Sequence, residues 1–258
     1  MSDIPPTTTG STASIGNNSI AQGDVNNQLL RILDPEDFAA IAPHLTRVPL
    51  EPNTVLAPSG AAITRIFFPE AAVIGLVEVL DSGQRLATAL SGREGFVGWP
   101  LVLGNDRWPH DALVRAQRGT ALRIEADKFM AVVEERPKVR ALLLRYAMSL
   151  VAQMSRTIVS NLIHSVDRRT ARWLLLYHDR IDGDEISITH EELGIMLGVW
   201  RSSITDALHQ LEGNGAVRGY RGRVRVCNRQ ELEQLAGETY GFAEGEYARL
   251  LLAAQAPQ

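Results

Sequence analysis

The sequence of 258 residues contains a single cysteine, Cys227. One cysteine cannot form a disulfide within the chain, and it cannot supply the thiolates that hold an iron–sulfur cluster. Disulfide-stapled folds are excluded and iron–sulfur sensing is disfavoured. Cys227 lies at the end of an expected strand, and we predict that its small side chain is buried.

Long apolar runs are also missing, since no stretch reaches the length that spans a bilayer. The first residues lack the charged-then-apolar pattern of a secretory signal. We therefore expect a soluble, cytoplasmic protein without a membrane partner.

Catalytic and metal-binding motifs are absent as well. The six histidines form no i, i+4 pair with an accompanying carboxylate, and no serine or cysteine lies in a nucleophile motif. We therefore expect no catalytic residues, no metal site, no enzyme activity and no cofactor. Haem ligation by one histidine remains open, although no haem motif occurs.

Positive charge is scarce overall, with a formal net charge of −4, but it is concentrated locally. Residues 200–229 carry six arginines against two carboxylates. The whole molecule would not attract nucleic acid, so any attraction must come from this segment.

The stretch from Thr189 to Arg225 predicts two short helices, a tight turn and a basic hairpin. Thr189 and Glu192 have the spacing of a capping box at the start of the first helix. Gly194 permits a close helix crossing and Gly198 permits a sharp turn. This order of elements is typical of a winged helix-turn-helix, the domain that places its second helix in the major groove of DNA.

The second helix is expected to begin near Arg201 and to bury Ile204, Leu208 and Leu211, which recur at i, i+4 and i+7. Strands at 216–220 and 223–227 follow, joined at Arg221 and Gly222. The residues predicted to contact double-stranded DNA are Thr189, Arg201, Ser202, Ser203, Thr205, Asp206, His209, Arg221 and Arg223.

The rest of the chain predicts an α+β protein. Between residues 48 and 124, short β-rich runs are separated by turn signals, as in an antiparallel roll. Glycines 92, 95 and 98 have the spacing of a phosphate cradle, but in a β-rich region they more often form turns. The expected regions are an unpacked extension at 1–27, a β-roll at 28–136, a long helix at 137–165, the winged helix-turn-helix at 166–237 and a tail at 238–258.

The long helix carries apolar and small residues at alternating spacings of four and three, which is the pattern of a coiled-coil seam. We expect this seam to join two copies of the chain, although packing on the roll is the alternative. Its members are Leu143, Ala147, Leu150, Met154, Thr157 and Asn161.

This arrangement resembles the CRP/FNR superfamily of bacterial transcription regulators over about residues 28–237. The closest matches are EELGIMLGVWRSSITDAL, LEGNGAVRGYRGRV and the Gly-Arg-Glu-Gly-Phe-Val-Gly loop at 92–98. The resemblance implies a cyclic-nucleotide-binding-like roll and a homodimer that binds a palindromic operator and contacts RNA polymerase. It also implies that Arg201 is aimed at base edges, where guanine N7 and O6 suit an arginine.

The sequence departs from that family at the nucleotide pocket. Trp99 stands where cyclic-nucleotide-binding members carry an acid that binds the ribose, and Asp111 lies where they bind the cyclic phosphate. The altered pocket would comprise Trp99, Arg107, His110 and Asp111, with Arg107 or Arg115 as candidate substitute cations. We expect no useful affinity for cyclic AMP and an effector that is unknown.

Further departures lie at the start of the reading helix and within it, where Ser202 also replaces a glutamate. Trp200 replaces a small capping residue, and Asp206 replaces a basic residue. They keep open an alternative function, a ligand-sensing or protein-interaction member of the fold that has lost specific DNA binding.

Overall fold

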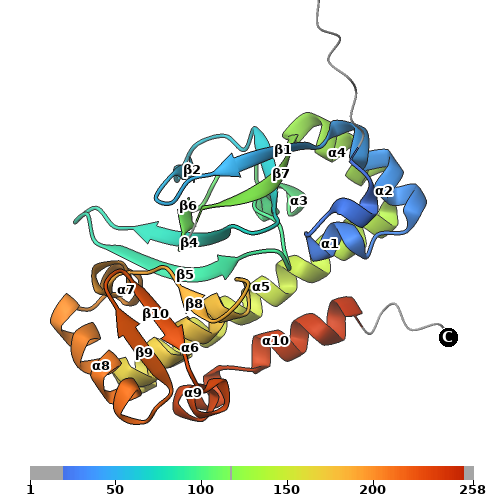
Figure 1. Ribbon diagram of the computed structural model, residues 1–258. Coiled ribbons are helices and arrows are strands. Elements are labelled where there is room, and N and C mark those ends of the chain that lie inside the picture. The colour runs from blue at the N-terminus through green and yellow to red at the C-terminus, as the bar shows by residue number, and fades with distance from the viewer. Residues whose placement is uncertain (1–19, 117, 253–258) are drawn as a thin grey trace, which may run out of the picture.

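The computed structural model describes residues 20–116 and 118–252 of the chain. An antiparallel roll is followed by one long helix and a small C-terminal domain, and the last helix returns along the long helix (Figure 1). The α+β class expected from the sequence is confirmed.

A short helical lead-in packs against the roll. It comprises η1 (Gln22–Asp24), α1 (Gln28–Arg31), α2 (Pro35–Ile41) and η2 (Ala42–His44). Asn27 is fully buried and caps α1, while its amide nitrogen donates to the carbonyls of Pro69 and Gly95 at 2.9 and 2.8 Å. Val25 is also buried. An unpacked extension up to residue 27 is therefore wrong for residues 22–27, while residues 1–19 lie outside the described part.

The roll consists of two antiparallel sheets, with strand orders β1-β7-β3 and β2-β6-β4-β5. Its strands are β1 (Thr46–Leu50), β2 (Val55–Ala57), β3 (Arg65–Pro69), β4 (Val73–Val79), β5 (Arg85–Ser91), β6 (Asp111–Arg115) and β7 (Gly119–Glu125). A short helix, α3 (Trp99–Val102), lies between β5 and β6. Alternation along β6 turns Ala112 and Val114 into the roll and Leu113 toward the C-terminal domain.

Two helices carry the chain out of the roll: α4 (Ala126–Glu135) and the 27-residue α5 (Pro137–Ile163). Pro137 opens α5, where its missing N–H costs no helical hydrogen bond. Within the described residues, no helix has both the length and the apolar character needed to cross a membrane.

The C-terminal domain packs three helices and a small sheet on α6. Its elements are α6 (Val166–His178), β8 (Glu185–Ile186), α7 (His190–Leu197), α8 (Arg201–Gly213), β9 (Val217–Tyr220), β10 (Arg223–Val226) and α9 (Arg229–Ala236). The strand order is β8-β10-β9. Buried residues of this domain form one cluster with Val73, Val77 and Leu113 of the roll, so the two halves share a core.

The tail folds back over α5 as η3 (Gly237–Thr239), α10 (Phe242–Tyr247) and the π-helical turn η4 (Ala248–Leu252) (Figure 1). The Arg156 guanidinium lies 3.9 Å from the centre of the Phe242 ring. Leu251 is fully buried in the core of the roll. The tail therefore connects the C-terminal domain to the roll.

The seam expected on α5 faces the chain itself. Leu143, Ala147 and Leu150 are 2–3% exposed, and Met154 packs on the cluster around Leu150. Thr157 accepts a hydrogen bond from Arg172 of α6 at 3.1 Å. The seam prediction is therefore wrong for these five residues, because the roll and α6 already cover that face.

Asn161, the last member of that seam, is exposed. Its side-chain oxygen accepts a hydrogen bond from Arg169 of α6 at 3.0 Å. Asn161 thus helps to join α5 to α6.

Candidate nucleic-acid interface

Helix α7 begins as the sequence predicts. The hydroxyl of Thr189 accepts from the backbone N–H of Glu192 at 3.1 Å, and the Glu192 carboxylate accepts from the Thr189 N–H at 2.8 Å. Two backbone donors at the helix start are thereby satisfied. The predicted capping box is confirmed.

The turn between α7 and α8 needs glycine at two positions. Gly198 has φ = 66°, in the left-handed region where a side chain is strained. A Cβ on Gly194 would lie 2.9 Å from the carbonyl oxygen of Val199. These glycines let α8 follow α7 closely, as a helix-turn-helix requires.

Helix α8 buries the predicted stripe: Ile204, Leu208 and Leu211 are at most 2% exposed. Trp200 precedes the helix without a side-chain capping bond and is 84% exposed. The helix start is therefore held by packing of the buried stripe rather than by a cap.

The residues predicted to contact DNA differ in their exposure to solvent. Arg201, Ser202, Asp206 and His209 of α8 and Thr189 of α7 are exposed. Ser203 is half-buried.

Thr205 is half-buried and is tied into the protein. Its hydroxyl donates to the Arg201 carbonyl at 3.1 Å and lies 2.9 Å from Nδ1 of His190. Burial, aided by the charge of Arg201, lowers the pKa of His190. His190, which the sequence analysis does not select, thus connects α7 to α8, and only its place one residue after the cap signals it.

The hairpin behind α8 is basic on one face. Val224 and Val226 are buried, whereas Arg223 and Arg225 between them are exposed. Arg223 pairs with Glu185 at 3.1 Å and lies 5.1 Å from the centre of the Tyr220 ring.

Four arginines of α8 and the hairpin have side chains without an ion pair or hydrogen bond to any described residue. They are Arg201, Arg218, Arg221 and Arg225. Arg218 and Arg225 belong to the basic segment but are not among the residues predicted to contact DNA, although strand alternation places both side chains on the exposed face.

Cys227 is exposed, so its predicted burial is wrong. The strand ends at Val226, and alternation carries the next side chain outward. The backbone N–H of Cys227 donates to the Ala216 carbonyl at 2.9 Å and so closes the base of the hairpin.

The start of α8 borders the roll. Leu86 of β5 packs directly on Gly198. A groove of about 870 Å³ lies between the loop at 83–85 and the turn at 198–201. The first turn of α8 and the tip of the β4–β5 hairpin therefore form one surface.

In the roll, Trp99 and His110 lie together. Their ring centroids are 5.9 Å apart and the rings are 21° from parallel. His110 is 3% exposed, and neither Trp99 Nε1 nor His110 Nε2 has a hydrogen-bond partner among the described residues. Burial lowers the pKa of His110 to about 4, despite the nearby charge of Asp111.

The candidate cations do not join this pair. Arg107 is exposed and donates to the Gly60 carbonyl at 2.9 Å. Arg115 donates to Asn53 at 3.3 Å and lies on the face of β6 opposite Ala112 and Val114. Asp111 accepts from the Ser59 N–H at 2.8 Å. Of the predicted pocket residues, only Trp99 and His110 meet.

The fold combines an N-terminal β-roll with a C-terminal winged helix-turn-helix domain. The profile of the Crp-like helix-turn-helix domain matches residues 168–235. Comparison with curated proteins found no match.

Three solved structures show the same fold. A CRP/FNR-family transcriptional regulator from Eubacterium rectale is 17% identical, with a TM-score of 0.63 over 81% of this chain and 97% of its own. A CRP/FNR-family regulator from Thermus thermophilus is 19% identical, with a TM-score of 0.61 over 75% and 100%. FixK2 from Bradyrhizobium japonicum is 14% identical, with a TM-score of 0.63 over 74% and 96%.

The chain therefore carries a Crp-like helix-turn-helix domain at residues 168–235, within the fold that these structures share. Among the described residues, no cluster of histidine, cysteine, aspartate or glutamate is arranged to hold a metal ion.

Proposed function

We propose that the chain acts as a homodimer that reads a palindromic operator with α8, without a response to cyclic AMP. The observation that carries the proposal is the arginine set of α8 and the hairpin, whose charges no described carboxylate neutralises. Arg201, in the first turn of α8, would read base edges, while Arg221 at the hairpin tip would bind phosphate.

Dimer formation is supported by an exposed apolar stripe along α5. Met148, Val151, Ile158 and Leu162 are 55%, 41%, 60% and 79% exposed. With Ser155 they recur at alternating spacings of three and four, as in a two-stranded coiled coil. A second copy of the chain would cover this stripe and provide the second reading helix that a two-fold operator needs.

Indifference to cyclic AMP is supported by the Trp99–His110 pair. A buried, uncharged imidazole stacked on an indole offers no positive charge to a cyclic phosphate. Arg107 and Arg115 are each engaged elsewhere. Contact with RNA polymerase is proposed from the family alone.

Selection of bound fragments from random duplex DNA tests the proposal. The full-length protein should enrich two inverted half-sites about one helical turn apart, centre to centre. Adding cyclic AMP should leave the motif and the affinity unchanged. Enrichment of no motif would favour the alternative function, in which the fold senses a ligand or a protein and no longer binds DNA specifically.

A further inference from the structure

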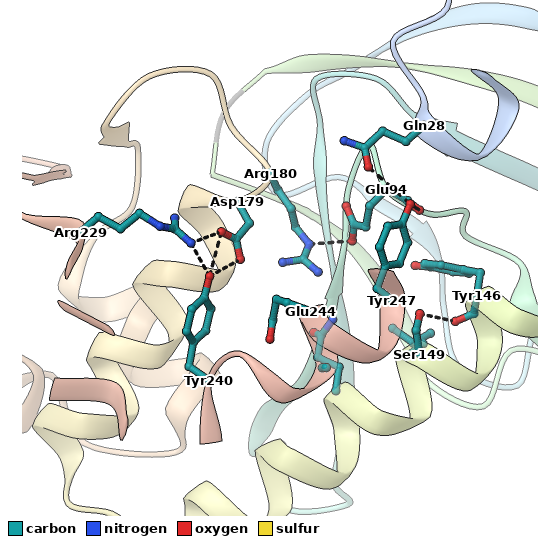
Figure 2. Close-up of a pocket in the computed structure, with 13 residues that line it drawn as sticks. Gln28, Glu94, Tyr146, Ser149, Asp179, Arg180, Arg229, Tyr240, Glu244 and Tyr247 are labelled. Atoms are coloured by element: carbon teal, nitrogen blue, oxygen red, sulfur yellow. Dashed lines mark hydrogen bonds and ion pairs between the residues drawn. The ribbon is translucent and has the colours of Figure 1, made fainter. Parts of the chain in front are cut away.

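A cavity of about 310 Å³ lies between the roll, α5, the end of α6 and the tail (Figure 2). The loop at 92–98 supplies one wall through Glu94, and α10 supplies another through Ala243, Glu244 and Tyr247. Cavities that bind small molecules span about 300–1,000 Å³, so this one suits a small ligand. The cavity is separate from the Trp99–His110 pair.

The glycines of the loop at 92–98 let it approach the residues around the cavity. A Cβ on Gly92 would lie 2.8 Å from the Arg180 side chain, and a Cβ on Gly95 would overlap the Tyr146 ring. The glycine spacing therefore serves close packing against α5 and the end of α6.

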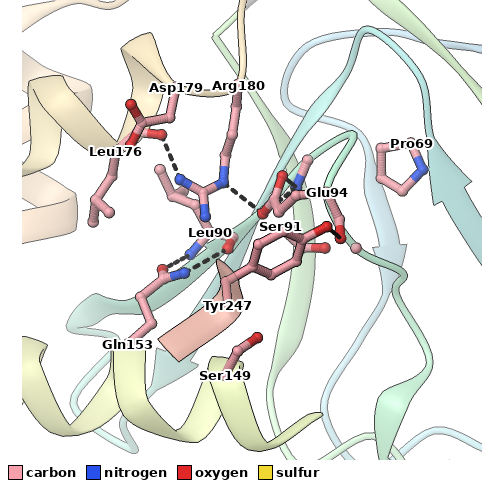
Figure 3. Close-up of polar contacts among 12 residues, drawn as sticks. Pro69, Leu90, Ser91, Glu94, Ser149, Gln153, Leu176, Asp179, Arg180 and Tyr247 are labelled. Carbon is pink, nitrogen blue, oxygen red and sulfur yellow. Dashed lines mark hydrogen bonds and ion pairs between the residues drawn. The ribbon is translucent and has the colours of Figure 1, made fainter. Parts of the chain in front are cut away.

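Arg180 presents one free donor to the cavity. It is 6% exposed, its Nε donates to Glu94 at 2.8 Å, and its Nη1 donates to the Leu176 carbonyl at 2.6 Å (Figure 3). Its Nη2 has no hydrogen-bond partner among the described residues. Burial opposes the charge, but Glu94, Asp179 and Glu244 together hold the pKa of Arg180 above its ordinary value.

Glu244 presents the opposite charge. Its Oε2 accepts the N–H of Gly241 at 2.9 Å, while Oε1 accepts no hydrogen bond from any described residue. No ion pair joins Glu244 to Arg180, although both line the cavity (Figure 2). A guanidinium and a carboxylate therefore face the same space without neutralising each other.

Glu94 is paired with Arg180 through Nε at 2.8 Å, and the other charges at the cavity are paired as well. Arg229 binds Asp179 at 2.7 Å and also contacts the Tyr240 hydroxyl. The Tyr247 hydroxyl donates to the Glu94 carbonyl at 2.9 Å. Apart from Arg180 Nη2 and Glu244 Oε1, the cavity thus offers aromatic and aliphatic surface and neutral hydroxyl and amide groups.

We propose that this cavity binds a small zwitterion, a free α-amino acid, with the carboxylate on Arg180 Nη2 and the ammonium group on Glu244 Oε1. Charge-assisted hydrogen bonds at both ends would fix the ligand, and Tyr146 and Leu150 would contact its side chain. On α5, these wall residues lie roughly opposite the exposed stripe at 148–162, so a dimer would leave the cavity accessible.

The ligand would also join the tail to the roll and to the end of α6, and so restrain the C-terminal domain. This part of the inference rests on the proposed DNA-binding function. We expect the bound amino acid to change the affinity for the operator by stabilising one arrangement of the two halves.

The test is calorimetric titration of the full-length protein with each of the twenty common α-amino acids. At least one should bind, and its N-acetyl and carboxamide derivatives should bind at least about tenfold more weakly, because each lacks one charge. Glu244→Gln keeps the oxygen that caps α10 and removes the charge, so it should weaken binding by a similar factor. Glu246→Gln is the matched control, since Glu246 pairs with Arg249 outside the cavity.

Thermal unfolding followed by circular dichroism establishes that both variants are folded. Absence of binding by all twenty amino acids, or equal affinity of Glu244→Gln and the wild type, overturns the proposal. DNA binding is measured separately, so loss of operator recognition with intact amino-acid binding would refute the proposed function and leave the binding site standing.

Discussion

At the scale of single residues, burial in the roll keeps the His110 side chain uncharged at neutral pH. The ring is 3% exposed and Nε2 has no hydrogen-bond partner among the described residues, so protonation would place a charged donor in the core without a hydrogen bond at Nε2. Stacking on Trp99 holds the neutral ring in place. The pair therefore makes a compact, uncharged site.

The stability of the roll should consequently fall in mild acid. The pKa of His110 is about 4 in the folded protein, against about 6.5 for an unfolded chain. Between these values the unfolded state binds more protons, so the free energy of unfolding decreases as the pH falls and is fully restored above about 6.5. Between pH 7 and pH 5, His110 should account for about 2 kcal/mol.

Urea unfolding of wild type and His110→Phe at both pH values measures this contribution. The phenyl ring keeps the stacked shape and cannot be protonated, so the loss of stability on acidification should be smaller by about 2 kcal/mol. If the free energy of unfolding fell equally in both proteins between pH 7 and pH 5, His110 would not be the group whose protonation destabilises the roll.

At the scale of elements, the helix-turn-helix was the most predictable part of the molecule. Thr189, Gly198 and Ile204 follow local rules for caps, turns and buried stripes, and local rules do not depend on distant packing. The same holds for the hairpin, where alternation placed Val224 inside.

The face of α5 could not be predicted in the same way. Two stripes along this helix carry coiled-coil spacing, and the sequence does not say which one the roll and α6 cover. In the structure, tertiary packing buries Leu143 and Leu150, so their stripe is the one that the roll and α6 cover. The cavity proposed to bind an amino acid could not be predicted from the sequence either. Its residues Glu94, Arg180 and Glu244 are far apart in sequence and are brought together only by the fold.

The exposed stripe yields a prediction about assembly. Ile158 is 60% exposed, and Ile158→Glu should raise the dimer dissociation constant at least about tenfold, because a dimer would bury an unpaired carboxylate. Leu103→Glu is the control, since Leu103 is 56% exposed but lies outside α5. Light scattering after size exclusion should show monomers only for Ile158→Glu. A wild-type protein that is itself monomeric, or an Ile158→Glu dimer as stable as wild type, would contradict this role of the stripe.

At the scale of the whole molecule, an acidic protein exposes a cluster of arginines on α8 and the hairpin. The net charge of −4 gives no general attraction to DNA, so the proposed affinity would depend on the arginines of α8 and the hairpin. The shared core and the returning tail connect that cluster to the roll. Binding should therefore depend strongly on salt through a few identifiable residues.

The proposed contact of Arg201 with the operator can be tested by measuring the affinity of the protein for operator and for unrelated DNA across a salt series. Arg201→Ala should lower the preference for the operator by about 5- to 150-fold. Arg221→Ala should weaken binding to both sequences and reduce the salt slope by about one, while Arg118→Ala, on the roll, should change neither. An Arg201→Ala protein that keeps the wild-type preference for its operator would contradict the account.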